Sequence, residues 1–133
     1  MVVNRLWVSV SLAVLLVGCG YPVDPDKWVP DFGIEGDHGA IAINAEDMSG
    51  ALTARFLSQE EADARALGMC GAGCEIVLRF EGGDACGALA SASDGRYGAA
   101  EGRVKAATES AAIEQCSLAG GNDCQVQLSG CNS

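Results

Sequence analysis

The stretch GAIAIN at residues 39–44 decides the fold, because a matching stretch, GALASA, follows at residues 87–92. The cysteines fall in the same order in the two halves, and the matched residues are Cys70 with Cys116, Cys74 with Cys124, and Cys86 with Cys131. The segments EIVL (75–78) and QVQL (125–128) align between these anchors. From His38 onward this pattern indicates an internal repeat of two units.

The first unit carries signals for a strand, a turn, a second strand, a helix and a third strand. Residues 39–44 and 51–56 predict the first two strands. Ser58-Gln59-Glu60-Glu61 fits a capping box at the start of a helix, and Gly71-Ala72-Gly73 predicts its end. A third strand follows, with one face made by Ile76, Leu78 and Phe80.

The second unit repeats this order. Asp94-Gly95 is a strong turn signal between the predicted strands 87–92 and 96–101. A helix from about Val104 to Cys116 and a strand from Cys124 to Leu128 complete the unit. Two such units predict an α+β domain, with an antiparallel sheet on one side and two helices on the other.

The first segment of the chain, MVVNRLWVSVSLAVLLVGCG, has the pattern of an export signal. Arg5 is its only charge, and the uncharged run from Leu6 to Val17 is shorter than the ~20 apolar residues of a spanning helix. Leu16-Val17-Gly18-Cys19 resembles the bacterial lipobox, in which the chain is cut before the cysteine and the cysteine is acylated. The alternatives are a plain secretory signal with an incidental cysteine, or a buried N-terminal helix.

The chain therefore divides into a signal peptide (1–18), a lipid anchor with an acidic, proline-containing tether (19–37), and a cysteine-rich repeat domain (38–133). Acyl chains such as palmitate on Cys19 would make the lipid bilayer a partner. The expected location is the cell envelope, facing the periplasm. Because Gly20 follows Cys19 in place of an aspartate, which would resemble an inner-membrane retention signal, the outer membrane is expected where the cell has one.

With Cys19 assigned to the lipid, six of the seven cysteines remain. An even number of cysteines in an exported chain predicts disulfides, here three of them. The pseudo-symmetry of the repeat favours two matching short-range disulfides, Cys70–Cys74 and Cys116–Cys124. It also favours a third disulfide, Cys86–Cys131, that joins the two halves. The competing interpretation is a zinc site at Cys70 and Cys74. Zinc sites usually repeat a short cysteine spacing or add histidines, and His38 is the only histidine, so no metal is expected.

Charge and chemistry exclude several function classes. The chain carries 18 acidic and 8 basic residues, a formal charge of −10, which disfavours nucleic acid and is compatible with a basic protein partner. A surface or capping role is expected for His38, at the tether junction. The pairs Glu60–Glu61 and Glu46–Asp47 fall on a predicted helix start and a turn, where solvated charge is usual. No catalytic residue, metal or cofactor is predicted, and the chain is not expected to be an enzyme.

Four segments carry a resemblance to a known family: GAIAIN (39–44), ALGMCGAGCEIVLRF (66–80), ACGALA (85–90) and CQVQLSGCN (124–132). They resemble the bacterial exported domain of unknown function 4189. The resemblance covers residues 38–133 and implies an exported cysteine-rich domain, with no activity to carry over.

The sequence thus predicts a membrane-anchored envelope lipoprotein that acts as a non-enzymatic protein-binding module. One alternative is an immunity or inhibitor lipoprotein directed against a basic, envelope-targeting enzyme. The other is a housekeeping, structural envelope lipoprotein.

Overall fold

The structure is a computed structural model that describes residues 27–133. In chain order these residues form β1 (Trp28–Phe32), β2 (His38–Asn44), β3 (Ser49–Phe56), α2 (Gln59–Cys70), β4 (Glu75–Glu81), β5 (Cys86–Ser91), β6 (Tyr97–Gly102), α3 (Lys105–Leu118) and β7 (Gln125–Cys131). The predicted α+β class, with mainly antiparallel strands and two helices, is confirmed. The predicted signal peptide, the predicted lipidation residue Cys19 and the first part of the predicted tether lie outside the described residues.

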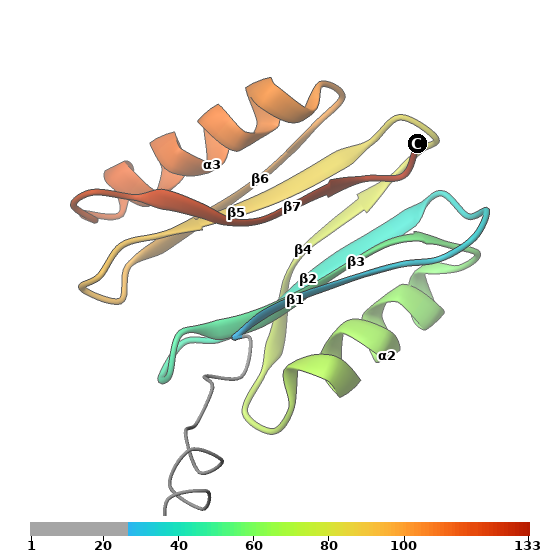
Figure 1. Ribbon diagram of the computed structural model, residues 1–133, viewed down its shortest axis with the longest axis horizontal. Coiled ribbons are helices and arrows are strands. Elements are labelled where there is room, and N and C mark those ends of the chain that lie inside the picture. Colours follow the sequence, from blue (N-terminus) through green and yellow to red (C-terminus); the bar gives the residue numbers. More distant parts are fainter. Residues whose placement is uncertain (1–26) are drawn as a thin grey trace, which may run out of the picture.

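The strands form two sheets that pack face to face between the helices (Figure 1). The first sheet has the strand order β1-β3-β2-β4 and is covered by α2, whereas the second has the order β6-β5-β7 and is covered by α3. Each unit therefore places its first strand, β2 or β5, between its second and third. The helices cover opposite outer faces, and not one common side as the sequence predicts, because each sheet has two buried faces.

Alternation of large and small side chains builds these layers. In β2, Ile41 and Ile43 belong to the core between the sheets, whereas Ala40 and Ala42 pack against alanines of α2. In β5, Leu89 belongs to the central core, and the alanines on either side of it face α3. Alanine on the helix-facing side lets each helix approach its sheet closely.

Phe80 of β4 fixes the distance between the sheets. A Cβ atom on Gly39 would lie 2.2 Å from the Phe80 ring, and a Cβ atom on Gly87 would lie 2.6 Å from it. The first glycine of GAIAIN and the first of GALASA thus make room for one fully buried ring. Any side chain at either position would displace this ring.

Residues 28–32, which the sequence analysis assigns to the tether, form β1 at the edge of the first sheet. β1 runs parallel to β3, from Trp28 beside Gly50 to Phe32 beside Ala54. The Trp28 ring packs against the central core, and Asp31 accepts a hydrogen bond from Arg65 of α2 (2.6 Å). These contacts anchor the strand, so the folded domain begins before the predicted boundary at His38.

Among residues 27–133 the structure has three disulfides, with the predicted pairing of Cys70–Cys74, Cys116–Cys124 and Cys86–Cys131. The last bond does not join the two halves as expected. Cys86 begins β5 and stands directly opposite Cys131 at the end of β7, so this bond closes the second sheet.

The two helices begin differently, which gives a test of local stability. The Ser58 hydroxyl accepts a hydrogen bond from the Glu61 backbone N–H at the start of α2 (3.1 Å), whereas α3 follows Val104, whose side chain has no polar atom. We expect Ser58→Ala to lower the free energy of unfolding by about 1 kcal/mol, and Val104→Ser to raise it by up to about 1 kcal/mol. Urea denaturation of both variants measures this, and a Val104→Ser variant no more stable than the parent would contradict it.

Candidate functional site

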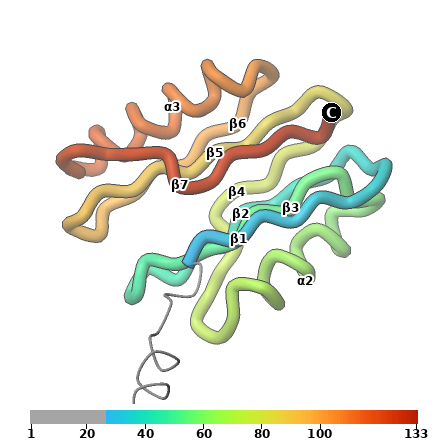
Figure 2. Tube along the Cα trace, in the orientation of Figure 1, coloured from blue at the N-terminus to red at the C-terminus, as the bar shows by residue number. Residues whose placement is uncertain are grey.

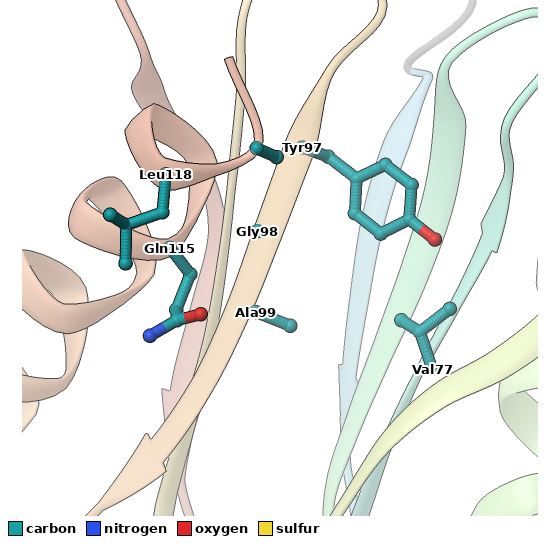
Figure 3. A pocket seen from close by; sticks show the side chains of 7 residues that line it. Val77, Tyr97, Gly98, Ala99, Gln115 and Leu118 are labelled. Carbon is teal, nitrogen blue, oxygen red and sulfur yellow. The ribbon is translucent and has the colours of Figure 1, made fainter. Parts of the chain in front are cut away.

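A groove of about 630 Å³ lies at the junction of β4, β6 and α3. We call it the β6 groove, and its lining residues are Val77, Tyr97, Gly98, Ala99, Gln115, Leu118 and Ala119. Figure 3 shows Gln115 and Leu118 reaching from α3 on one side of β6, and Tyr97 and Val77 on the other. Its volume is in the usual range for ligand sites in proteins.

Gly98 allows the helix wall of the groove to form. A Cβ atom at this position would lie 2.2 Å from the backbone nitrogen of Cys116 and 2.5 Å from the carbonyl carbon of Gln115. Without that atom, α3 lies directly on β6. This contact brings Gln115 and Leu118 to the edge of the strand, and the Leu118 side chain stays 74% exposed.

A β-bulge places Val77 in the opposite wall. Ile41 pairs with Leu78 and the next residue, Ala42, pairs with Ile76, so Val77 is the extra residue on β4. Both Val77 and Leu78 therefore turn toward the second sheet and pack against the central core. β7 has its extra residue at Gln127, which is the counterpart of Val77 in the aligned segments EIVL and QVQL.

The outer edge of β6 is open, since within residues 27–133 this strand pairs only with β5. The Arg96 carbonyl accepts a hydrogen bond from the Ala92 N–H, so the even-numbered residues of β6 direct their backbone groups to β5. Tyr97, Ala99 and Glu101 consequently direct their N–H and C=O groups away from the sheet, into the groove and along its continuation.

The edge strand of the first sheet on this side is better protected. β4 carries the exposed charges of Glu75, Arg79 and Glu81, and it is bulged at Val77. Charges and bulges discourage the pairing of an edge with another chain. β6 has only Glu101 and is otherwise made of small residues and Tyr97.

The residues singled out from the sequence do not gather at this groove. His38 begins β2 with its Nδ1 3.0 Å from Asp37 and its Nε2 3.5 Å from Glu81. Glu60 and Glu61 lie in the exposed first turn of α2, and Glu46 and Asp47 lie in the β2–β3 turn. Over residues 27–133 there is no group of three His, Cys, Asp or Glu side chains suited to a metal ion, and no helix has the length and apolar character needed to cross a membrane.

The groove residues could not be identified from sequence patterns. Val77 is indistinguishable in the sequence from the other apolar residues of β4, and Tyr97 is one of few aromatic residues in an alanine-rich chain. Leu118 lies beyond Cys116, where the predicted second helix ends, and its exposure is visible only in the structure.

Comparison with known families agrees with the resemblance drawn from the four quoted segments. Residues 38–131 match the family described as domain of unknown function (DUF4189). Neither the curated proteins nor the solved structures include a match to the chain. The matched region covers all the described elements except β1, and the chain belongs to the DUF4189 family.

Proposed function

We propose that the chain is an exported lipoprotein, held to a membrane by acyl chains on Cys19, whose domain is a non-enzymatic protein-binding module of the cell envelope.

The observation that carries the export and the anchor is the use of the cysteines. The three disulfides take up all six cysteines among residues 27–133, and the seventh, Cys19, stands at the end of the signal-like segment. Disulfides form and persist in oxidising compartments such as the periplasm. A cysteine left outside the disulfide set, within a lipobox-like sequence, is the one available for lipid.

The position of β1 limits how far the domain stands from the lipid. Residues 20–27 separate Cys19 from the first residue of β1. These residues span at most about 29 Å when fully extended. The domain therefore works close to the bilayer surface, and its partners are proteins that reach that surface.

Charge favours basic partners. Three arginines are already paired with aspartates, in the ion pairs Arg65–Asp31, Arg79–Asp63 and Arg103–Asp84. Because acidic residues outnumber basic ones by 18 to 8, most of the remaining surface charge is negative. This supports a second candidate function, the inhibition of a basic enzyme that attacks the envelope, whose association would be steered by the field.

Intact mass measurement on protein extracted from membranes tests the anchor. We expect a species that lacks residues 1–18 and carries the mass of the acyl chains, and we expect Cys19→Ser to abolish both changes. Gly20→Ser is the matched control and should be processed like the parent. Cleavage at another position, or a mature chain without lipid, would contradict the proposal.

Affinity capture from envelope extract, read by mass spectrometry at low and high salt, separates the binding functions. An inhibitor should retain one dominant basic protein that high salt releases. Retention of no protein would favour the structural, housekeeping alternative.

A further inference from the structure

β1 occupies, on the first sheet, the place that the β6 groove leaves open on the second. β1 lies against β3, contacts α2, and runs beside β7 of the other sheet (Figure 2). The groove is bounded in the same way by β6, α3 and β4. β3 and β6 are the second strands of their units, β7 and β4 the third strands, and α2 and α3 the helices between them. The two locations are therefore equivalent in the architecture.

We propose that the β6 groove accepts an extended segment of a partner protein, which adds to the second sheet as a strand parallel to β6. The segment carries an apolar residue opposite Tyr97 and a basic residue opposite Glu101. This inference rests on the proposed function as a protein-binding module and names the binding mode and the chemistry of the partner.

The register of β1 on β3 predicts the register of the added partner segment on β6, and we call this segment the guest strand. Ala42 pairs with Ala51 in the first sheet and its counterpart Ala90 pairs with Gly98 in the second, so Ala51 corresponds to Gly98. Trp28, beside Gly50, then marks a guest position opposite Tyr97, and Phe32, beside Ala54, marks a position opposite Glu101. A guest strand in this register is bonded by the outward backbone groups of Tyr97, Ala99 and Glu101.

The walls select the side chains of the guest. Apolar side chains fit between Val77 and Tyr97 on one side and against Leu118 on the other. Glu75 and Glu101 are exposed, and neither takes part in an ion pair within residues 27–133, so both favour a basic guest.

The surface that α3 presents to the guest strand differs from the surface that α2 presents to β1. Arg65, which holds Asp31 of β1, corresponds to Ala111 in α3 when Cys70 is matched with Cys116. An acidic residue at this guest position therefore finds no cation at the place in α3 that corresponds to Arg65, and a small neutral residue suits it better.

The probe is the peptide Ac-KWVPAKG-NH2, which is residues 27–33 of the chain with alanine in place of Asp31 and lysine in place of Phe32. The full chain, exported and oxidised, is held in detergent micelles, and binding is followed by fluorescence anisotropy of the labelled peptide. Hydrogen exchange monitored by NMR locates the site. We expect the amide hydrogens of Tyr97, Ala99 and Glu101 to exchange at least tenfold more slowly when the peptide is bound. Slowed exchange confined to other residues would overturn the proposal.

Backbone methylation of the peptide tests strand pairing directly. In β1 the Lys27 carbonyl accepts from the Gly50 N–H and the Gly33 N–H donates to Ala54, so the odd-numbered positions face the sheet. We expect N-methylation at the positions of Val29 and Asp31 to weaken binding at least tenfold, and N-methylation at the positions of Trp28 and Phe32 to change it less than threefold. Equal effects of the two peptides would rule out strand addition.

Protein variants test the walls and the charge. Leu118→Lys should weaken binding at least tenfold, whereas Ser117→Lys adds the same charge one residue away, off the groove, and should weaken it less than threefold. Glu101→Lys should also weaken binding, and a peptide with glutamate in place of its second lysine should restore it. Equal losses of peptide affinity for Leu118→Lys and Ser117→Lys would show that only net charge matters, and would overturn the proposal that the peptide binds in the β6 groove.

The unmodified peptide, Ac-KWVPDFG-NH2, distinguishes a second copy of the chain from another partner. Tighter binding of this peptide would assign the groove to β1 of a second copy and overturn the proposed partner chemistry. Peptide binding does not depend on lipidation at Cys19. If neither peptide binds, the strand-addition proposal is wrong, whereas the lipid anchor of the proposed function is still tested separately by the intact mass measurement.

Discussion

Replacing Cys86 and Cys131 together by alanine is expected to lower the free energy of unfolding by about 4 kcal/mol. The two cysteines are separated by 45 residues in sequence, so their bond closes a long loop in the unfolded chain. Closing a longer loop removes more conformational entropy from the unfolded state. The bond also holds the ends of β5 and β7 together, where the second sheet would otherwise fray.

The control is the paired replacement of Cys70 and Cys74, whose separation is 4 residues. The same entropy relation gives a loss of about 2 kcal/mol for this short clip. Urea denaturation under oxidising conditions measures both losses. Equal losses for the two double variants would mean that loop closure does not govern the stability contributed by these bonds.

The elements that local signals specify could be predicted from the sequence. The capping box at Ser58 begins α2, and the turn signal Asp94-Gly95 separates β5 from β6. The matched cysteines gave the correct disulfide pairing. In each case the deciding contacts lie within a few residues in the chain or follow from matching one half of it to the other.

The stacking of two sheets could not be predicted in this way. The alternation in GAIAIN is between isoleucine and alanine, both apolar, so it does not show that one face meets a helix and the other a second sheet. β1 was missed for a related reason. Its proline and acidic neighbours suggest a tether, and only the pairing with β3 and the contact from Asp31 to Arg65 make it a strand.

The groove depends on contacts between the two units, which is why sequence patterns did not reveal it. Val77 comes from the first unit and reaches the groove through a bulge, whereas Tyr97 and Leu118 come from the second. The opening itself arises because the strand corresponding to β1 is missing beside β6 among residues 27–133. A difference between two similar halves is visible only once their strands have been placed.

Asn132 is a further residue for which no role could be predicted, although it is 5% exposed and links three segments of the chain. Its side-chain oxygen accepts a hydrogen bond from the Arg55 backbone N–H (2.8 Å), and its amide nitrogen donates to the carbonyls of Asp37 (2.8 Å) and Gly82 (3.0 Å). Arg55 has a φ of 67°, an unusual backbone conformation for arginine that this bond helps to hold. The end of β7 is thus linked to the end of β3, to the loop before β2, and to the turn after β4.

We expect Asn132→Ala to lower the free energy of unfolding by about 3 kcal/mol, because three hydrogen bonds are lost and each contributes about 1 kcal/mol. The carbonyls of Asp37 and Gly82 each keep one other donor, the backbone N–H of Gly82 and of Ala85 respectively. Asn132→Asp is the more specific test. It keeps the shape of the side chain and the oxygen that accepts from the Arg55 N–H, but it replaces the amide nitrogen that donates to Asp37 and Gly82 with an oxygen. It should be at least as unstable as the alanine variant. The exposed neighbour serves as the control, and Ser133→Ala should stay within about 0.5 kcal/mol of the parent in urea denaturation. If Asn132→Asp were as stable as the parent, the two donated bonds would contribute nothing, and the link between the sheets would depend on the bond to Arg55 alone.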